Sequence, residues 1–380
     1  MASDSQRLHA LDLLRGVAVV VMVLGHSIDA VLSPAERTTE LFRLYDAVRG
    51  FTAPVFLFVS GLAFTVATER RWDDYRRAGR PLTMRLLRIG LLFLIGYALH
   101  FPFFSLAKLL NGTTPQDRAS FLQVDVLHCV AASLLLLQAM VLTASTPRVF
   151  ARRTAVLAGG TVLLSPLLWG RDLASAISPV VAPYLNMREP SIFPLLPFGA
   201  FFFTGAVAGH RFLRARAAGR EPQFLRRIFV TGILAIGLGV VLEFLPITLL
   251  PPHDYWKASP NFFMVRTGIV LTILALFFSA RRVPGSLGRQ VVTLGQASLL
   301  VYVVHLLIVY GSAANQGLAQ LLGRTSGPAT AAGIGLVVLL GMLGMVHGWN
   351  VLRSGRVVPP RVVHLALVSS LLFLFVMNPY

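Results

Sequence analysis

Residues 11–29, LDLLRGVAVVVMVLGHSID, form an apolar run of membrane-spanning length with an arginine near one end and a histidine near the other. Arg15 and His26 are eleven residues apart. On an α-helix this is three turns plus about 20°, so both side chains lie on one face, roughly 16 Å apart along the axis. Ionisable groups inside a span are costly and usually face a protein interior or a watery cavity. The stretch therefore predicts a membrane helix that carries the two ends of one functional path.

The composition of the whole chain is that of a polytopic membrane protein. Of 380 residues, 55% are hydrophobic and 13% are charged, and the mean hydropathy of +0.71 excludes an ordinary soluble globule. We predict an all-α membrane protein with about eleven transmembrane helices, all within a single domain that covers residues 1–380. The predicted spans are residues 10–30, 48–68, 85–107, 121–144, 154–170, 191–210, 228–248, 262–280, 291–311, 328–351 and 362–377.

The basic residues are distributed as expected for a membrane protein with a cytoplasmic N-terminus and an extracytoplasmic C-terminus. The chain has 34 Lys and Arg against 16 Asp and Glu, a net charge of +18. In this orientation 24 basic residues lie on inside segments, nine lie on outside loops, and Arg266 lies within the eighth span. Because this bias follows the positive-inside rule, we expect a lipid-bilayer partner, a bacterial-type cytoplasmic (inner) membrane and no nucleic acid.

Cys129 is the only cysteine in the chain. An intramolecular disulfide and a cysteine-ligated metal site are therefore excluded, and we predict no metal.

Two predicted spans carry further ionisable groups on one helical face. Asp125 and His128, at positions i and i+3 of the fourth span, form either a packing pair or a functional pair, and their predicted depth favours function. In the ninth span, Ser298, Tyr302 and His305 recur at steps of four and three, which predicts one polar stripe. His305 lies about 20 Å along that span, at a depth comparable to that of His26.

Two sets of residues near the predicted membrane surfaces are candidates for ligand binding. Arg85 and Arg88, three apart where the third span begins, are either interfacial anchors or a phosphate clamp. On the outer side, Tyr255 and Trp256 are either belt aromatics or a sugar-binding lip. Arg266 lies a few residues into the following span, where an arginine needs an anion, and Glu243 is a candidate partner.

These residues resemble the signature of the transmembrane acyltransferase superfamily, the acyltransferase type 3 family. The resemblance rests on Arg15 and His26 in an R-x10-H element, on Arg85-Leu86-Leu87-Arg88 as R-x-x-R, and on FLFVSGLAF and LGQASLLVYVVHLL. Other segments are similar to the catalytic domain of the related heparan-α-glucosaminide N-acetyltransferase: FLQVDVLHCVA, SIFPLLPFGAFFFTGAVAG and DYWKASPNFFMVRTG. That branch is expected to carry its catalytic histidine in the first outer loop, but residues 27–50 contain none, so His26 takes its place.

The resemblance implies a cytosolic acyl-CoA donor, with acetyl-CoA as the main expectation, and a carbohydrate acceptor on the far side, an amino sugar or a polysaccharide. Arg85 and Arg88 are then expected to bind the phosphates of CoA, with Arg15 beside the pantetheine arm. His26 is expected to act as general base, assisted by Asp125, His128 and His305. Tyr255, Trp256, Arg266 and Tyr302 are the expected acceptor-binding residues.

Several alternatives stay open from the sequence. A proton-coupled transporter or flippase also places histidines and carboxylates along an intramembrane path. Within acyl transfer, the sequence leaves open N- or O-acylation, the acyl chain length, a histidine-bound acyl intermediate and the oligomeric state, with a homodimer among the options.

Overall fold

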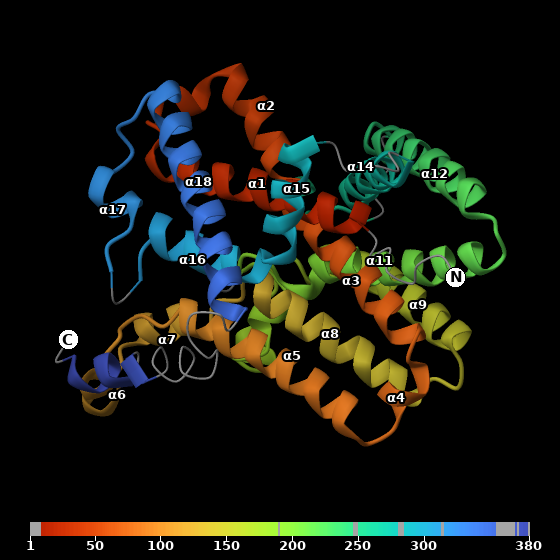
Figure 1. Ribbon diagram of the computed structural model, residues 1–380, viewed down its shortest axis with the longest axis horizontal. Coiled ribbons are helices and arrows are strands. Elements are labelled where there is room, and N and C mark those ends of the chain that lie inside the picture. The colour runs from red at the N-terminus through yellow and green to blue at the C-terminus, as the bar shows by residue number, and fades with distance from the viewer. Residues whose placement is uncertain are drawn as a thin grey trace. The chain divides into compact units, whose positions relative to one another are not determined.

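A computed structural model of the protein describes residues 9–188, 191–245, 250–279, 285–312, 315–354, 369–370 and 372–378. Over these residues the named elements are all helices and there is no β-strand (Figure 1). The predicted all-α fold is confirmed.

Seven of the described helices are long and apolar enough to cross a membrane, or eight if the bent pair α15–α16 is one span. The seven candidate spans are Ala10–Val31, Glu40–Glu69, Arg80–Leu99, Val126–Thr143, Glu221–Glu243, Pro260–Ser279 and Pro328–Arg353. The predicted number of about eleven is not confirmed. Half of the eleventh predicted run, residues 362–377, lies outside the described residues.

Two predicted spans correspond to helices with a short apolar length. Helix α9, Pro147–Leu168, begins with arginines, and its apolar part, residues 154–168, is only roughly 22 Å long. In α11, Leu195–Ala217, the backbone of Leu196 is not helical and arginines follow His210. The apolar stretch between these points is roughly 21 Å long, less than the ~30 Å of a hydrocarbon core.

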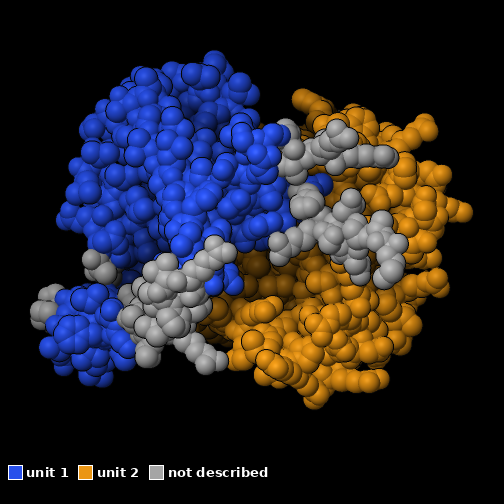
Figure 2. Space-filling model, viewed as in Figure 1, with its two compact units in different colours: residues 1–52, 99–121, 283–380 blue, residues 53–98, 122–282 orange. Residues whose placement is uncertain are grey.

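The helices form two compact units that interleave along the chain (Figure 2). Unit 1 contains residues 1–52, 99–121 and 283–380. Unit 2 contains residues 53–98 and 122–282.

Unit 1 is built around α1, His9–Val31, which packs against three later helices: α15 (Gly285–Gln296), α16 (Ser298–Val309) and α18 (Pro328–Arg353). Fully buried valines from these helices share one core: Val19, Val23, Val301, Val309 and Val346. The other described helices of the unit are short: η1 (Ala35–Thr38), α2 (Glu40–Arg49), α6 (Leu106–Asn111), α7 (Pro115–Phe121) and α17 (Leu318–Leu322).

Within unit 2, glycines bring helices α3 (Thr52–Glu69) and α11 closer together than they bring any other pair of its described helices. A Cβ atom at Gly61 would overlap the carbonyl oxygen of Phe202, and one at Gly205 would overlap that of Phe58. Small residues let the two backbones approach this closely, as is common in membrane helix packing. The other helices of the unit are α4 (Trp72–Arg76), α5 (Arg80–Leu99), α8 (Val126–Thr143), α9, α10 (Leu173–Ala176), η2 (Ala182–Tyr184), α12 (Glu221–Glu243), α13 (Tyr255–Ala258) and α14 (Pro260–Ser279).

Candidate active site

Arg15 and His26 of α1 both contact α16 within unit 1. The Nη2 atom of Arg15 donates a hydrogen bond to Ser298 Oγ at 2.8 Å. The Nδ1 atom of His26 lies 2.9 Å from His305 Nε2, and the two rings are nearly parallel, with an interplanar angle of 10°. The predicted shared face of α1 is therefore the face that meets the polar residues of α16.

The hydrogen bonds of the two histidines fix their neutral tautomers. His305 Nδ1 lies 2.8 Å from the carbonyl oxygen of Val301, and because a carbonyl can only accept, Nδ1 carries the proton. His305 Nε2 is then an acceptor, so the hydrogen bond from His26 places a proton on His26 Nδ1. In the neutral pair, the remaining lone pair of His26 is on Nε2.

The polar stripe predicted on the ninth span is buried against its neighbours. Ser298 is 3% exposed, Tyr302 is 8% exposed and His305 is fully buried. Ser298 and His305 are seven residues apart, roughly 10 Å along α16.

A sharp break in the ninth span brings this stripe to α1. The predicted single helix over residues 291–311 is two helices, α15 and α16, bent by 83°. Near the break, a Cβ atom at Gly295 would overlap the carbonyl oxygen of Asp12, and one at Gly16 would overlap that of Val291. The Gln296 side chain also donates to Asp12 Oδ2 at 3.2 Å. The apolar pattern of residues 291–311 predicted no such break.

At the other end of α1, an ion-pair cluster that was not predicted from the sequence lies beside His26. Asp29, one turn after His26, accepts from Arg37 Nη1 at 2.7 Å and pairs with Arg49 Nη1 at 3.3 Å. The Tyr45 hydroxyl donates to the carbonyl oxygen of Gly25 at 2.9 Å. These contacts fasten η1 and α2 to the last turns of α1. A carboxylate at i+3 from the histidine was the available sequence signal.

Asp125 and His128 form the predicted pair in unit 2, with His128 Nδ1 lying 2.9 Å from Asp125 Oδ1. Asp125 is also the N-cap of α8, where its side chain accepts from the backbone N–H groups of Leu127 and His128. Such capping stabilises a helix start. The geometry therefore gives the pair a structural role at the beginning of α8.

His128 is fully buried in an aromatic surround. The Tyr97 ring centroid is 4.3 Å away, and the hydroxyls of Tyr97 and Tyr184 are 2.7 Å apart. A Cβ atom at Gly96 would lie 2.7 Å from the imidazole, so only glycine leaves room for the ring. Burial and the Tyr97 hydrogen bond raise the pKa of the Tyr184 hydroxyl, which keeps it neutral.

Arg85 and Arg88 differ in their surroundings. Arg85 Nη1 donates to Thr68 Oγ1 at 3.0 Å and to Gln138 Oε1 at 2.9 Å. Its Cζ atom lies 3.2 Å from the centroid of the Tyr75 ring. These contacts join α3, α4 and α8 at one guanidinium. Arg88, in contrast, is exposed.

The predicted outer lip is an aromatic cluster on α13 and α14. The ring centroids of Tyr255 and Trp256 are 5.3 Å apart, and those of Trp256 and Phe262 are 4.7 Å apart. Arg266 lies over the Phe262 ring, with Cζ 4.0 Å from the centroid. Burial, with the carboxylate of Glu243 nearby, raises the pKa of the Tyr255 hydroxyl. Glu243 does not pair with Arg266 as suggested; its Oε2 atom accepts from Asn261 Nδ2 at 3.0 Å.

Comparison with known protein families shows which family the chain belongs to. The sequence model of the acyltransferase type 3 family, an acyltransferase domain, matches residues 8–347. The chain belongs to the acyltransferase type 3 family. No curated protein matches the chain. With several helices that can span a membrane, this acyltransferase type 3 protein is a membrane acyltransferase and an enzyme.

The matched range of the acyltransferase type 3 family includes Arg15 and His26 on α1, Arg85 and Arg88 on α5, and His305 on α16. The structure brings Arg15, His26, Tyr302 and His305 together within unit 1. Asp125, His128, Arg85, Arg88 and the outer lip belong to unit 2.

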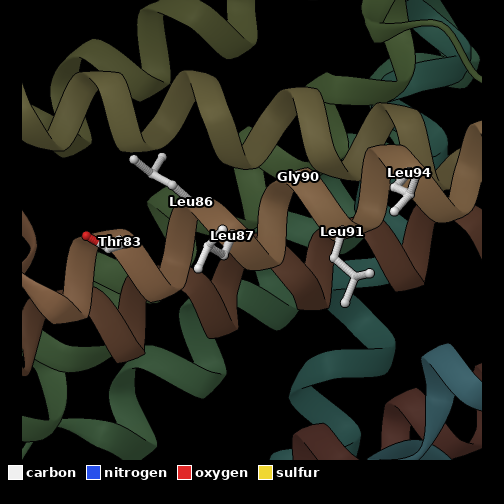
Figure 3. A pocket seen from close by; sticks show the side chains of 6 residues that line it. All are labelled: Thr83, Leu86, Leu87, Gly90, Leu91 and Leu94. Atoms are coloured by element: carbon white, nitrogen blue, oxygen red, sulfur yellow. The ribbon is translucent and has the colours of Figure 1, made fainter. Parts of the chain in front are cut away.

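A shallow hollow on α5 is a poor candidate for the acyltransferase chemistry. It has a volume of about 520 Å³ and is lined by the outward face of one helix (Figure 3): Thr83, Leu86, Leu87, Gly90, Leu91 and Leu94. Figure 3 shows these leucines pointing away from the helix. Five of its six residues are apolar, as expected of a surface that faces lipid.

The described part of the chain contains no group of three or more His, Cys, Asp or Glu residues that could hold a metal ion. The prediction of a metal-free site stays a prediction.

Proposed function

We propose that this membrane acyltransferase transfers an acyl group, acetyl in the first instance, from cytosolic acyl-CoA to a carbohydrate on the other side of a bacterial-type inner membrane. His26 acts as the general base. The observation that supports this best is the hydrogen-bond chain from His26 Nδ1 through His305 to the carbonyl oxygen of Val301.

This chain prepares His26 to accept a proton at Nε2. The carbonyl of Val301 holds the proton on His305 Nδ1, so His305 presents only its Nε2 lone pair to His26. When His26 Nε2 accepts a proton, the resulting imidazolium keeps its Nδ1–H bond to His305. The hydrogen-bond chain ends at a carbonyl oxygen, which accepts a hydrogen bond but does not take up the proton. His305 therefore orients His26 and does not relay a proton.

The reaction balances with His26 alone as the proton carrier. An acceptor hydroxyl or amine attacks the thioester carbonyl while His26 Nε2 removes its proton. The tetrahedral oxyanion then collapses, the C–S bond breaks, and the imidazolium returns the proton to the leaving CoA thiolate. The products are an acyl ester or amide and free CoA.

The arginines support the donor side of this proposal. Arg88 is exposed and sits among the basic residues of 70–88, which together suit the phosphates of CoA. Arg85 shares this region, but its Nη1 atom is bound by Thr68 and Gln138, so it orders the phosphate-binding segment. Arg15, held by Ser298, lines the path of the pantetheine arm towards His26.

The acceptor side is assigned to polar and aromatic groups. Tyr302 lies between Ser298 and His305 on the buried stripe of α16, where its hydroxyl can bind an acceptor hydroxyl. Tyr255, Trp256 and Arg266 form the outer lip in unit 2. Asp125 and His128 support unit 2 as a pair that fixes the start of α8.

The decisive experiment measures acyl transfer by the purified full-length protein in nanodiscs. Radiolabelled acetyl-CoA is supplied with a panel of amino-sugar and polysaccharide acceptors, and we expect label in the acceptor. His26→Ala should reduce transfer by roughly 10²- to 10⁴-fold, the contribution of a general base.

The matched control is His347→Ala. His347 also bonds the carbonyl four residues before it, Leu343, but is exposed on α18, and its loss should leave transfer unchanged. Full activity in His26→Ala would refute the assignment. Substrate movement across the membrane without acyl transfer would favour the transporter alternative.

A further inference from the structure

Arg266 is a half-buried cation that forms no hydrogen bond or ion pair with the part of the chain that the structure describes. Its Nε atom is inaccessible to solvent and bonds to none of the described residues. The carboxylate suggested as its partner, Glu243, is bound by Asn261. An unpaired guanidinium is costly to bury, so this position needs an anion that the described chain does not supply.

The stacking of Arg266 on Phe262 uses a face of the guanidinium and none of its N–H groups. The Cζ atom lies 4.0 Å from the centroid of Phe262, so the face of the guanidinium meets the ring. The N–H groups lie in the plane of the guanidinium, and a guanidinium fork matches the two oxygens of a carboxylate.

The neighbouring side chains have the chemistry of a sugar-binding surface. Trp256 is 62% exposed and packs on Phe262, with Tyr255 beside both. Exposed aromatic faces stack on the apolar faces of sugar rings. Asp254 Oδ1 is buried without a hydrogen-bond partner among the described residues, so it can accept from a hydroxyl.

We propose that Arg266, with Tyr255, Trp256 and Phe262, forms a subsite for a carboxylate-bearing sugar. The inference rests on the proposed function, in which the acceptor is a carbohydrate, and narrows that acceptor to an acidic glycan. A lipid phosphate is the competing anion. An arginine that reaches for lipid headgroups carries its charge into water, whereas the Arg266 Nε is buried, which favours the sugar.

The test compares two probes on the full-length protein in nanodiscs of phosphatidylcholine. One is a glucuronate-containing tetrasaccharide, and the other is the same tetrasaccharide with its carboxylates reduced to alcohols. Titration calorimetry should show roughly tenfold or tighter binding of the acidic form, the usual gain of a hydrogen bond to a charged group. Arg266→Gln should bind both forms equally.

Lys257→Gln is the matched control, because it removes a positive charge from the exposed surface of the same lip. It should keep the preference for the acidic probe within about twofold, as expected of an exposed charge. Arg266→Met keeps the apolar stem and should also lose the preference. Thermal melting of both Arg266 variants at or above the wild-type temperature would show that the protein remains folded.

Equal binding of the two probes by the wild-type protein would overturn the inference, as would a preference that survives in both Arg266 variants. Arg266-dependent binding of short-chain phosphatidylglycerol without any sugar preference would assign the site to lipid instead. If acyl transfer proceeds but the preference is absent, only this inference fails. If the preference is present but no acceptor is acylated, only the proposed function fails.

Discussion

At the scale of single residues, the hydrogen bonds of the two nitrogens of each imidazole determine how His26 and His305 are oriented. The carbonyl oxygen of Val301 holds a proton on one nitrogen of His305, and His305 in turn orients His26. If His305 donated from both of its ring nitrogens, the Nδ1–H group of His26 would have no acceptor. The role of His305 is therefore separable from that of His26 by substitution.

Replacing His305 tests this positioning role. His305→Gln retains a side-chain acceptor for His26 Nδ1–H and should keep kcat within about tenfold of the wild type. His305→Leu removes the acceptor and should lower kcat by roughly 10²-fold or more, since the contribution of the base depends on its orientation. The KM for acyl-CoA should change little in either variant. Equal loss in the two variants, or a loss confined to KM, would contradict a positioning role.

Substitution should likewise distinguish the roles of Arg85 and Arg88. Arg85→Gln removes the group that joins Thr68, Gln138 and Tyr75, so it should lower the melting temperature and loosen the 70–79 segment. Loss of such a partly buried hydrogen-bonded cation costs about 1.5–3 kcal/mol. Arg88→Gln should leave the melting temperature unchanged and raise the KM for acyl-CoA.

Thermal melting with and without CoA measures both effects. In Arg88→Gln, the rise in melting temperature on adding CoA should be smaller, while the melting temperature without CoA stays unchanged. In Arg85→Gln, the melting temperature without CoA should itself fall. An unchanged melting temperature without CoA in Arg85→Gln would mean that this arginine only binds the ligand.

At the scale of helices, the break between α15 and α16 determines which residues meet α1. Gly16 and Gly295 bring α1 and α15 into backbone contact, and the chain then turns by 83°. Only after this turn do Ser298 and His305 reach Arg15 and His26.

Gly295→Ala should therefore damage both stability and activity. The added methyl group would overlap the carbonyl oxygen of Asp12, and overpacking of this kind costs about 1–3 kcal/mol. Gly341→Ala in α18 is the control, because its Cβ atom would enter open space. Alanine is also more favourable than glycine within a helix by up to about 1 kcal/mol. We expect a lower melting temperature and slower acyl transfer only for Gly295→Ala. Equal behaviour of the two variants would mean that the crossing tolerates a methyl group.

Helical periodicity was sufficient to predict some of these contacts but not others. The shared face of Arg15 and His26, the stripe on α16 and the Asp125–His128 pair all follow from spacing along one helix. The break at Ala297, the Asp29 cluster and the Glu69–His210 pair, 2.7 Å apart, depend on partners far away in the sequence. No local pattern encodes such partners, and the apolar run 291–311 continues through the break without a proline.

At the scale of the whole molecule, the candidate residues are divided between two interleaved units. Unit 1 contains Arg15, His26 and His305, and unit 2 contains Arg85 and Arg88, which we propose to bind acyl-CoA, and the predicted outer lip. The proposal requires the arginines of residues 70–88 on the cytoplasmic side and Lys257, beside the lip, on the other. This sidedness follows from the distribution of the basic residues alone, and it can be tested directly.

Single cysteines introduced into a Cys129→Ala background test the sidedness. Lys257 and Arg77 are both exposed, so a cysteine at either position should react if the reagent reaches it. In intact cells, a membrane-impermeant maleimide should label Lys257→Cys, but should label Arg77→Cys only after permeabilisation. The Cys129→Ala protein itself should stay unlabelled. Labelling of Arg77→Cys in intact cells would place the donor arginines outside, where cytosolic acyl-CoA cannot reach them, and the proposed direction of transfer would be wrong.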